Sequence, residues 1–170
     1  VLRLIGLTSL SHFGFIVLGI FVFSSQGGSG AILYMVNHGI GTALLFLTAG
    51  MLIRRSGTSL ISEMRGIEKV TPVLAGVLLV AGLAGAGLPG LAPFVSELLV
   101  LISAFQYAWW AGAVAVTAIV LAAIYMLWMY QRTMTGPTPA AVEGLPDLSR
   151  RDVGVVAPLL LALVVFGFYP

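Results

Sequence analysis

Apolar residues fill five long segments of the chain, and polar residues gather in the links between them. The segments cover residues 4–24, 30–53, 70–88, 91–131 and 153–169. About 20 apolar residues in a helix cross the ~30 Å hydrocarbon core of a bilayer, so these segments predict membrane-spanning helices. The charged links 54–69 and 132–152 predict loops outside the membrane, and residues 25–29 predict a short uncharged turn. We therefore expect an all-α, polytopic transmembrane helix bundle with about five crossings, forming one domain over residues 1–170.

The segment 91–131 is too long for one straight crossing. Its 41 residues reach about 60 Å as a helix, so it forms either two crossings or one long discontinuous helix. One crossing places all eight cations on one side of the membrane, whereas two divide them five against three. This bias favours one discontinuous helix. We expect its break where polar and small residues interrupt the run, at Gln106, Tyr107, Trp109, Trp110 and Gly112. Broken membrane helices tend to mark transport paths.

The composition excludes a soluble globular domain. Hydrophobic residues make up 59% of the 170 and charged residues 8%, against about 25% charged in soluble domains, and the mean hydropathy is +1.09. The net charge is only +2 and the cations are not interleaved with aromatic residues, so we expect the lipid bilayer, and no nucleic acid, as a partner. The absence of cysteine excludes iron–sulfur ligation and thiolate metal sites. From the ends at Val1 and Pro170 we expect an internal piece of a longer membrane protein.

Glu97 is the only charged residue inside an apolar segment. A charge in the middle of a membrane costs about 2.5 to 3.5 kcal/mol on insertion scales, so such residues are usually functional. A carboxyl group in an apolar environment can take up and release a proton near neutral pH. The alternative is a protonated glutamate that hydrogen-bonds to a neighbouring helix and serves packing alone.

Each of the two histidines shares a helix face with hydroxyl side chains one turn away. His12 has Thr8 and Ser9 beside it, and His38 has Tyr34 and Thr42. Histidine titrates near physiological pH and can relay protons through hydroxyl groups and water. The alternative for either residue is a neutral histidine that ties two helices together. Three titratable groups on three segments, without the spacing of metal ligands, favour a proton path over a metal site.

Small residues and prolines interrupt the apolar pattern between residues 82 and 93. Gly82 and Gly85 allow close packing of neighbouring helices. The Gly-Leu-Pro-Gly sequence at 87–90 lacks the lysine and hydroxyl residue of a phosphate loop, so we expect no nucleotide site. Pro89, Gly90 and Pro93 are typical of a break in a helix.

Four short motifs together resemble one family of membrane proteins. They are Ser-Leu-Ser-His-Phe-Gly-Phe at 9–15, Met-Val-Asn-His-Gly at 35–39, Gly-Leu-Pro-Gly at 87–90 followed by Phe94 and Ser-Glu-Leu at 96–98, and Phe-Gly-Phe-Tyr-Pro at 166–170. Across nearly the whole chain, this sequence is similar to the antiporter-like membrane subunits of respiratory complex I. A glutamate at position 97, where other members generally have lysine, favours the M type, called subunit 4 in mitochondria.

The resemblance implies the second, inverted half of a subunit with roughly 14 helices, with 91–131 matching the family's broken helix. It implies that Glu97 is the ionisable residue of that helix and that His12 and His38 are relay histidines. The family's first half supplies the rest of the proton path, so this chain alone is not expected to pump. The chain is expected to hold no cofactor, because NADH, flavin, iron–sulfur clusters and quinone belong to other subunits of the complex.

By the same resemblance, the partners are neighbouring antiporter-like subunits, and the location is the bacterial plasma membrane. The function implied is proton translocation coupled to quinone reduction by an NADH-quinone oxidoreductase. Two alternatives stay open: a subunit of a multi-subunit sodium/proton antiporter, and a segment that only braces its neighbours. The positive-inside rule places residues 54–69 in the cytoplasm, whereas the resemblance places them on the opposite side, so the orientation also stays open.

Overall fold

The computed structural model describes the backbone of residues 1–170 and the side chains other than that of position 141. The described chain is helical throughout, with links formed by turns and short 3₁₀ helices. The α-helices are α1 (Leu2–Phe21), α2 (Ser25–Ser56), α3 (Pro72–Gly85), α4 (Ala92–Tyr107), α5 (Trp109–Met134) and α6 (Arg150–Phe168). The 3₁₀ helices are η1 (Ile61–Glu63), η2 (Ile67–Lys69) and η3 (Ala140–Val142). The expected all-α membrane bundle is confirmed.

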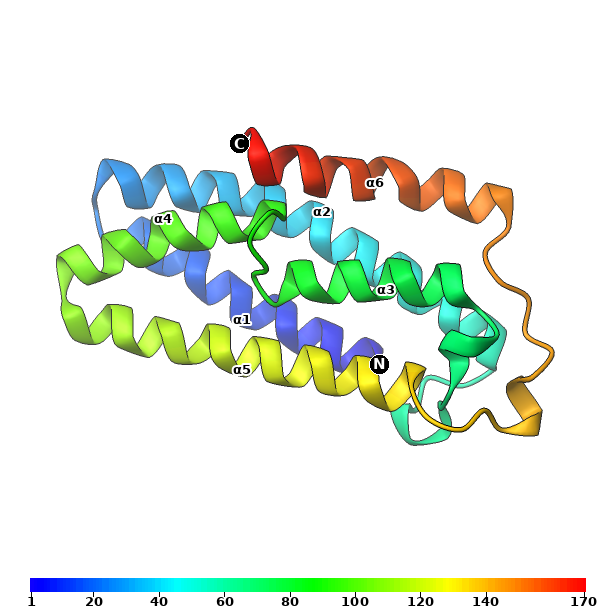
Figure 1. Ribbon diagram of the computed structural model, residues 1–170. Helices are drawn as coiled ribbons and strands as arrows, with labels where there is room; N and C mark the ends of the chain where they lie inside the picture. The colour runs from blue at the N-terminus through cyan, green and yellow to red at the C-terminus, as the bar shows by residue number, and fades with distance from the viewer.

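The helices form an elongated bundle in which α2 packs against α1, α3, α4 and α6 (Figure 1). Among the described residues, α1, α2, α5 and α6 are long and apolar enough to cross a membrane. Helices α3 and α4 have 14 and 16 residues, or about 21 and 24 Å, so each is shorter than the hydrocarbon core. They run in the same direction one after the other, so together they make one discontinuous crossing. The bundle therefore has five crossings.

One membrane helix is discontinuous, but the expectation that it breaks within 91–131 is wrong. The break falls at Pro89 and Gly90, where the sequence also indicated an interruption. The break lies between α3 and α4, at residues 86–91, and the segment 91–131 contains the second half of the broken helix followed by the complete helix α5. The chain reverses at Ala108, a single residue with extended backbone between α4 and α5. The polar and aromatic residues near 106–110 belong to this reversal, where Tyr107, Trp109 and Trp110 are exposed. Aromatic residues are enriched at membrane interfaces. At this reversal they mark the membrane boundary in place of charged residues.

The link between α1 and α2 is also shorter than the pattern predicts. The expected turn at 25–29 is already helical, because α2 begins at Ser25. The Ser24 side chain accepts a hydrogen bond from the backbone N–H of Gly27 at 3.0 Å and caps the helix. At the other end, α2 continues through Arg54 and Arg55 and stops at Gly57, which has a φ of 73°. The loop before α3 therefore starts three residues later than expected.

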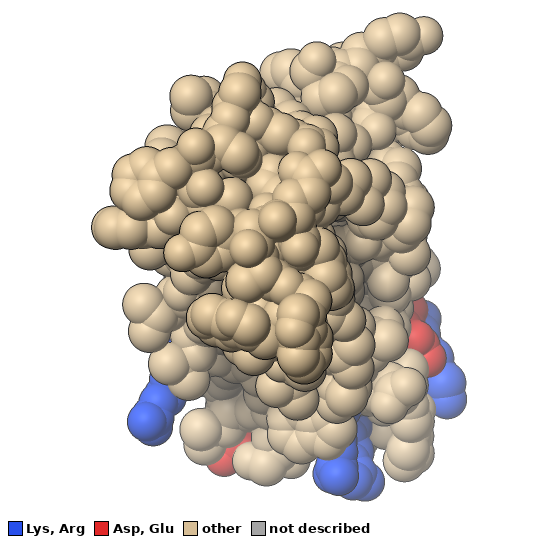
Figure 2. All heavy atoms as spheres, turned by 90° about the vertical axis from the view of Figure 1, so that its left-hand side faces the viewer, with Lys and Arg blue, Asp and Glu red and all other residues tan. Residues whose placement is uncertain are grey.

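All eight cations lie at one end of the bundle, as the charge bias predicts. Because α3 and α4 make only one crossing, every charged link falls on the same side. The cations are Arg3 in the first turn of α1, Arg54 and Arg55 at the end of α2, Arg65 and Lys69 between α2 and α3, Arg132 at the end of α5, and Arg150 and Arg151 at the start of α6. Figure 2 looks onto the opposite end, where uncharged side chains fill the foreground.

Hydrogen bonds to two aspartates tie the helix ends together at the charged end. Arg55, at the end of α2, donates to Asp152 of α6 at 2.7 Å and to the backbone carbonyl of Pro146 at 2.8 Å. The Asp147 carboxylate accepts the backbone N–H groups of Val73 at 2.8 Å and Leu74 at 3.0 Å. A carboxylate on these N–H groups satisfies the first turn of α3 and favours its dipole. The loop after α5 thereby fixes the start of the broken helix.

Candidate functional site

Glu97 and Tyr34 meet in the interior of the bundle, next to the helix break. The Tyr34 hydroxyl on α2 donates to Oε1 of Glu97 on α4 at 2.6 Å. The Tyr34 side chain is fully buried and Glu97 is 4% exposed. Among the described residues, no Lys or Arg side chain forms an ion pair with Glu97. The tyrosine hydroxyl is therefore the group that stabilises this carboxyl.

The two histidines lie close together across the contact between α1 and α2. The His12 and His38 rings are perpendicular, with their centroids 5.3 Å apart. The Ser9 hydroxyl is hydrogen-bonded to Nε2 of His38 at 2.8 Å, and the Thr42 hydroxyl lies 3.3 Å from either ring nitrogen of His38. The structure thus brings the two predicted histidine faces into one polar cluster.

Tyr34 connects this cluster to Glu97. Its ring centroid is 6.0 Å from that of His12 and 6.1 Å from that of His38, while its hydroxyl bonds to Glu97. The sequence suggested only that Tyr34 supports His38 on the same helix. The three predicted titratable residues lie around one tyrosine, and they come from three different helices.

The break places two backbone segments against the titratable side chains. Gly87 has a φ of 69°, in the region that glycine adopts without strain. A methyl group on Gly87 would overlap Oε2 of Glu97, so the carboxyl lies directly against this turn. Gly85, at the end of α3, lies 4.0 Å from the His12 ring when measured from its ideal Cβ position. Pro93 stands in the first turn of α4, where it requires no hydrogen-bond donor of its own.

Gly82 and Gly85 both face α5, and of the two only Gly85 makes a tight contact with it. Ideal Cβ atoms on Gly82 and Gly85 would lie 3.8 and 3.3 Å from Cε of Met126. The Sδ atom of the same methionine lies 3.9 Å from the hydroxyl of Thr8, which also donates to the Leu4 carbonyl at 2.9 Å. Thr8 therefore contacts α5, while Ser9 is the hydroxyl that bonds to a histidine.

Asn37 is a buried polar residue that our site prediction did not include. Its Nδ2 donates to the Ala92 carbonyl at 2.7 Å and to the Ser96 hydroxyl at 3.3 Å, so it binds the first turn of α4. Such contacts satisfy backbone groups that a broken membrane helix leaves unpaired. Its position three residues after Tyr34, on the same face of α2, was the signal available in the sequence.

A small cavity adjoins the histidines. It is lined by residues of α1, α2, α3 and α4, including Ser9, His12, His38, Thr42 and Gly85. The cavity has a volume of about 10 Å³, which is close to the minimum for one buried water molecule. The cavity can therefore place one water among the histidine and hydroxyl groups.

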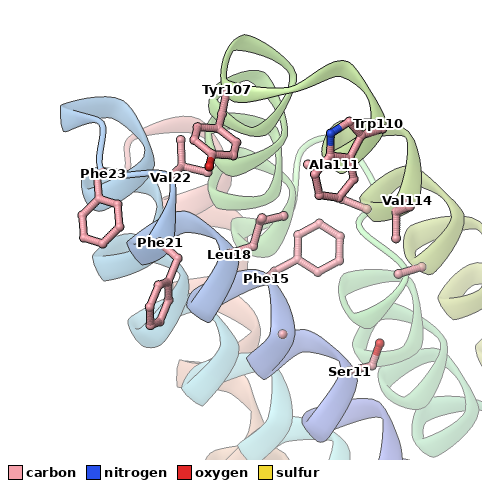
Figure 3. A pocket seen from close by; sticks show the side chains of 13 residues that line it. Ser11, Phe15, Leu18, Phe21, Val22, Phe23, Tyr107, Trp110, Ala111 and Val114 are labelled. Carbon is pink, nitrogen blue, oxygen red and sulfur yellow. The ribbon is translucent and has the colours of Figure 1, made fainter.

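A separate apolar hollow of about 570 Å³ lies between α1 and α5, near the end without charges (Figure 3). Phe15 and Leu18 extend toward it from α1, and Trp110 and Val114 line it from α5. Its polar lining residues are Ser11 and Tyr107. This hollow contains none of the predicted site residues, so it is not part of the site.

Comparison with known proteins identifies the family. Residues 1–122 match the family model described as NADH:quinone oxidoreductase/Mrp antiporter, TM. The chain belongs to this family. It is similar to NADH-quinone oxidoreductase subunit M of Mycobacterium tuberculosis, with 54% identity over 99% of this chain and 31% of the relative.

Solved structures agree with this assignment. A chain of respiratory complex I from Thermus thermophilus matches with a TM-score of 0.93 and 34% identity, over 98% of this chain and 35% of that one. A chain of the Mrp complex from Dietzia shares the fold, with a TM-score of 0.79 and 24% identity over 92% of this chain and 37% of that one. This chain thus spans about a third of the length of its relatives. The resemblance to antiporter-like subunits is confirmed, and the chain is an integral membrane protein.

Proposed function

We propose that this chain forms the proton-binding half of an M-type subunit in a proton-translocating NADH-quinone oxidoreductase. The observation that carries the proposal is the buried Glu97, hydrogen-bonded to Tyr34 beside the break of a discontinuous membrane helix. The similarity to subunit M of Mycobacterium tuberculosis supports the assignment to that enzyme. The location is the bacterial plasma membrane.

Glu97 holds the transported proton. When the carboxyl group is ionised, the Tyr34 hydroxyl donates to it. When it is protonated, it can donate to the tyrosine oxygen instead, since a hydroxyl group serves as donor or acceptor. The hydrogen bond between them persists in both states, so the proton can be exchanged without loss of the contact that positions Glu97.

His12 and His38 relay protons toward Tyr34 and Glu97. Ser9 and His38 are in direct hydrogen-bond contact. Among the described residues no hydrogen bond joins the His12 ring to His38 or Tyr34, although the rings pack against one another, so the route includes water between them. The cavity lined by His12 and His38 has room for one such water, between the two histidines. The proposed proton route therefore runs from Ser9 through His38, His12 and Tyr34 to Glu97.

The remaining parts of the reaction lie outside this chain. The energy comes from quinone reduction in other subunits. We assign the redox and catalytic centres, with NADH, flavin, iron–sulfur clusters and quinone, to those subunits and none to this chain. The energy of quinone reduction reaches this chain through changes in charge and hydration near Glu97. The other half of the subunit supplies the rest of the proton path, and neighbouring antiporter-like subunits are the partners.

Replacement of Glu97 in the full-length subunit tests the proposal. We expect Glu97→Gln to lower proton pumping and the coupled NADH-quinone reductase activity about tenfold or more, because the neutral amide cannot carry a proton. The matched control is Glu143→Gln, the same change at an exposed position outside the membrane helices. Assembly is measured alongside both rates. Unchanged pumping by assembled Glu97→Gln complex contradicts the proposal.

The same measurements separate the two alternatives. A sodium/proton antiporter subunit works without a quinone reductase and depends on sodium. The observation that favours it is the match to a family whose description also names the Mrp antiporter. A bracing segment tolerates Glu97→Gln without loss of pumping, but does not tolerate bulky residues at its close helix contacts.

A further inference from the structure

A charged hollow at the membrane boundary lies apart from the proton path. It opens between the end of α2 and the start of α6 and has a volume of about 650 Å³. Three arginines and two aspartates line it together with Ser149: Arg54, Arg55, Arg151, Asp147 and Asp152. Its formal charge is therefore +1.

The two carboxylates and one arginine are already committed to the protein. Asp147 accepts backbone N–H groups of α3, and Asp152 accepts from Arg55 and from the backbone N–H of Ser149 at 3.0 Å. Arg55 also donates to the carbonyls of Met51 and Pro146, so its guanidinium group is a fixed part of the wall.

Arg54 and Arg151 provide the unused positive charge. Both are exposed, and within the described part of the chain neither forms an ion pair. One stands at the end of α2 and the other at the start of α6. Their guanidinium groups offer planar sets of donors that suit a phosphate group.

The surroundings indicate where such a phosphate comes from. Helices α2 and α6 are both membrane spans, so the hollow lies at the level of lipid headgroups. Next to the hollow, the side chains of Val153 and Val155 on α6 are 39% and 44% exposed. They form an apolar surface that runs from the hollow along the helix. Basic pockets between the ends of transmembrane helices bind acidic headgroups.

We propose that this hollow binds the headgroup of an anionic phospholipid, with Arg54 and Arg151 contacting its phosphate. The acyl chains lie along the exposed apolar face of α6. The lipid joins the end of α2 to the start of α6 at the point where Arg55 and Asp147 hold the loop before α6.

The test measures lipid retention by the purified complex that contains the full-length subunit. The complex is incorporated into nanodiscs of phosphatidylcholine with a minor fraction of phosphatidylglycerol. It is then extracted with detergent, and the lipids that stay bound are counted by mass spectrometry. We expect Arg54→Gln combined with Arg151→Gln to weaken phosphatidylglycerol binding at one site by about tenfold or more. The control, Arg3→Gln with Arg150→Gln, removes the same charge at the same end of the bundle but outside the hollow.

Three results overturn the proposal. Equal loss of phosphatidylglycerol from both double variants means that surface charge alone attracts lipid. Retention of phosphatidylcholine with the same dependence on Arg54 and Arg151 means that the site does not select a negative headgroup. Absence of a retained lipid in the unaltered complex, with Arg54 crosslinking to another subunit, means that a protein covers the hollow.

Discussion

The hydroxyl of Tyr34 donates a 2.6 Å hydrogen bond to Oε1 of Glu97, across 63 positions of the sequence and between two helices of the membrane bundle. This bond joins the helix that carries His38 to the second half of the discontinuous helix. It gives the buried carboxyl a neutral donor in place of a cation. The site therefore keeps its positioning contact in both protonation states of Glu97.

Removal of the Tyr34 hydroxyl tests this relationship. We expect Tyr34→Phe to lower proton pumping by the full-length complex several-fold, because a buried carboxyl oxygen that loses its donor costs about 1–3 kcal/mol. The complex should still assemble, since the ring and its packing remain. Tyr107→Phe, at a residue that is 66% exposed, is the control and should leave pumping unchanged. Equal pumping by the two variants contradicts the role of the hydroxyl.

Gly87 is predicted to be intolerant of any side chain. We expect Gly87→Ala to abolish coupled pumping, because the new methyl group overlaps the Glu97 carboxyl and the backbone φ of 69° costs an alanine about 1–2 kcal/mol. Gly90→Ala separates these two effects. Gly90 has a φ of 91° but would contact only the Phe168 ring, so its variant reports backbone strain without displacement of Glu97. If both variants pump alike, strain alone explains the loss.

Gly85 provides a test of helix packing that does not involve charge. We expect Gly85→Leu to prevent assembly, because an ideal Cβ on this residue already lies 3.3 Å from Cε of Met126 and 3.5 Å from Cδ1 of Leu45. Gly76→Leu, on the same helix but facing open space, is the control. Assembly is measured as the yield of intact complex after purification. Normal yield from Gly85→Leu disproves the close contact between α3 and its neighbours.

Asp147 is expected to stabilise the first turn of α3 from a distant loop. Replacement by alanine removes the acceptors of two backbone N–H groups, which for a helix cap costs about 1 kcal/mol. We therefore predict roughly fivefold faster hydrogen exchange at the start of α3 in Asp147→Ala. Exchange in the second half of α5 should not change. The same measurement on Glu143→Ala, in the same loop, is the control, and equal exchange in both variants excludes the cap.

The sequence by itself determined the membrane class and the number of crossings, and it singled out the candidate titratable residues. These follow from local physics. Apolar length is set by bilayer thickness, and an ionisable residue in an apolar run is costly enough that Glu97 stands out without a structure. The 3.6-residue period of a helix places Ser9 beside His12 and Thr42 beside His38. The charge bias also correctly placed all eight cations at one end of the bundle, although the break that it favoured, near residues 106–112, is a reversal between two helices.

Only the tertiary structure decided which of the two candidate breaks, near 89–93 or near 106–112, divides a membrane helix, and which side chains meet. An apolar run does not distinguish a half-helix plus a full crossing from one broken helix. The chain reverses at Ala108 without a charge or a proline, and the nearby Gly112 fits either arrangement. The contacts of Tyr34 with Glu97 and of Asn37 with Ala92 join residues more than 50 positions apart. Such partners depend on how whole helices pack against one another, and helix periodicity carries no information on that choice.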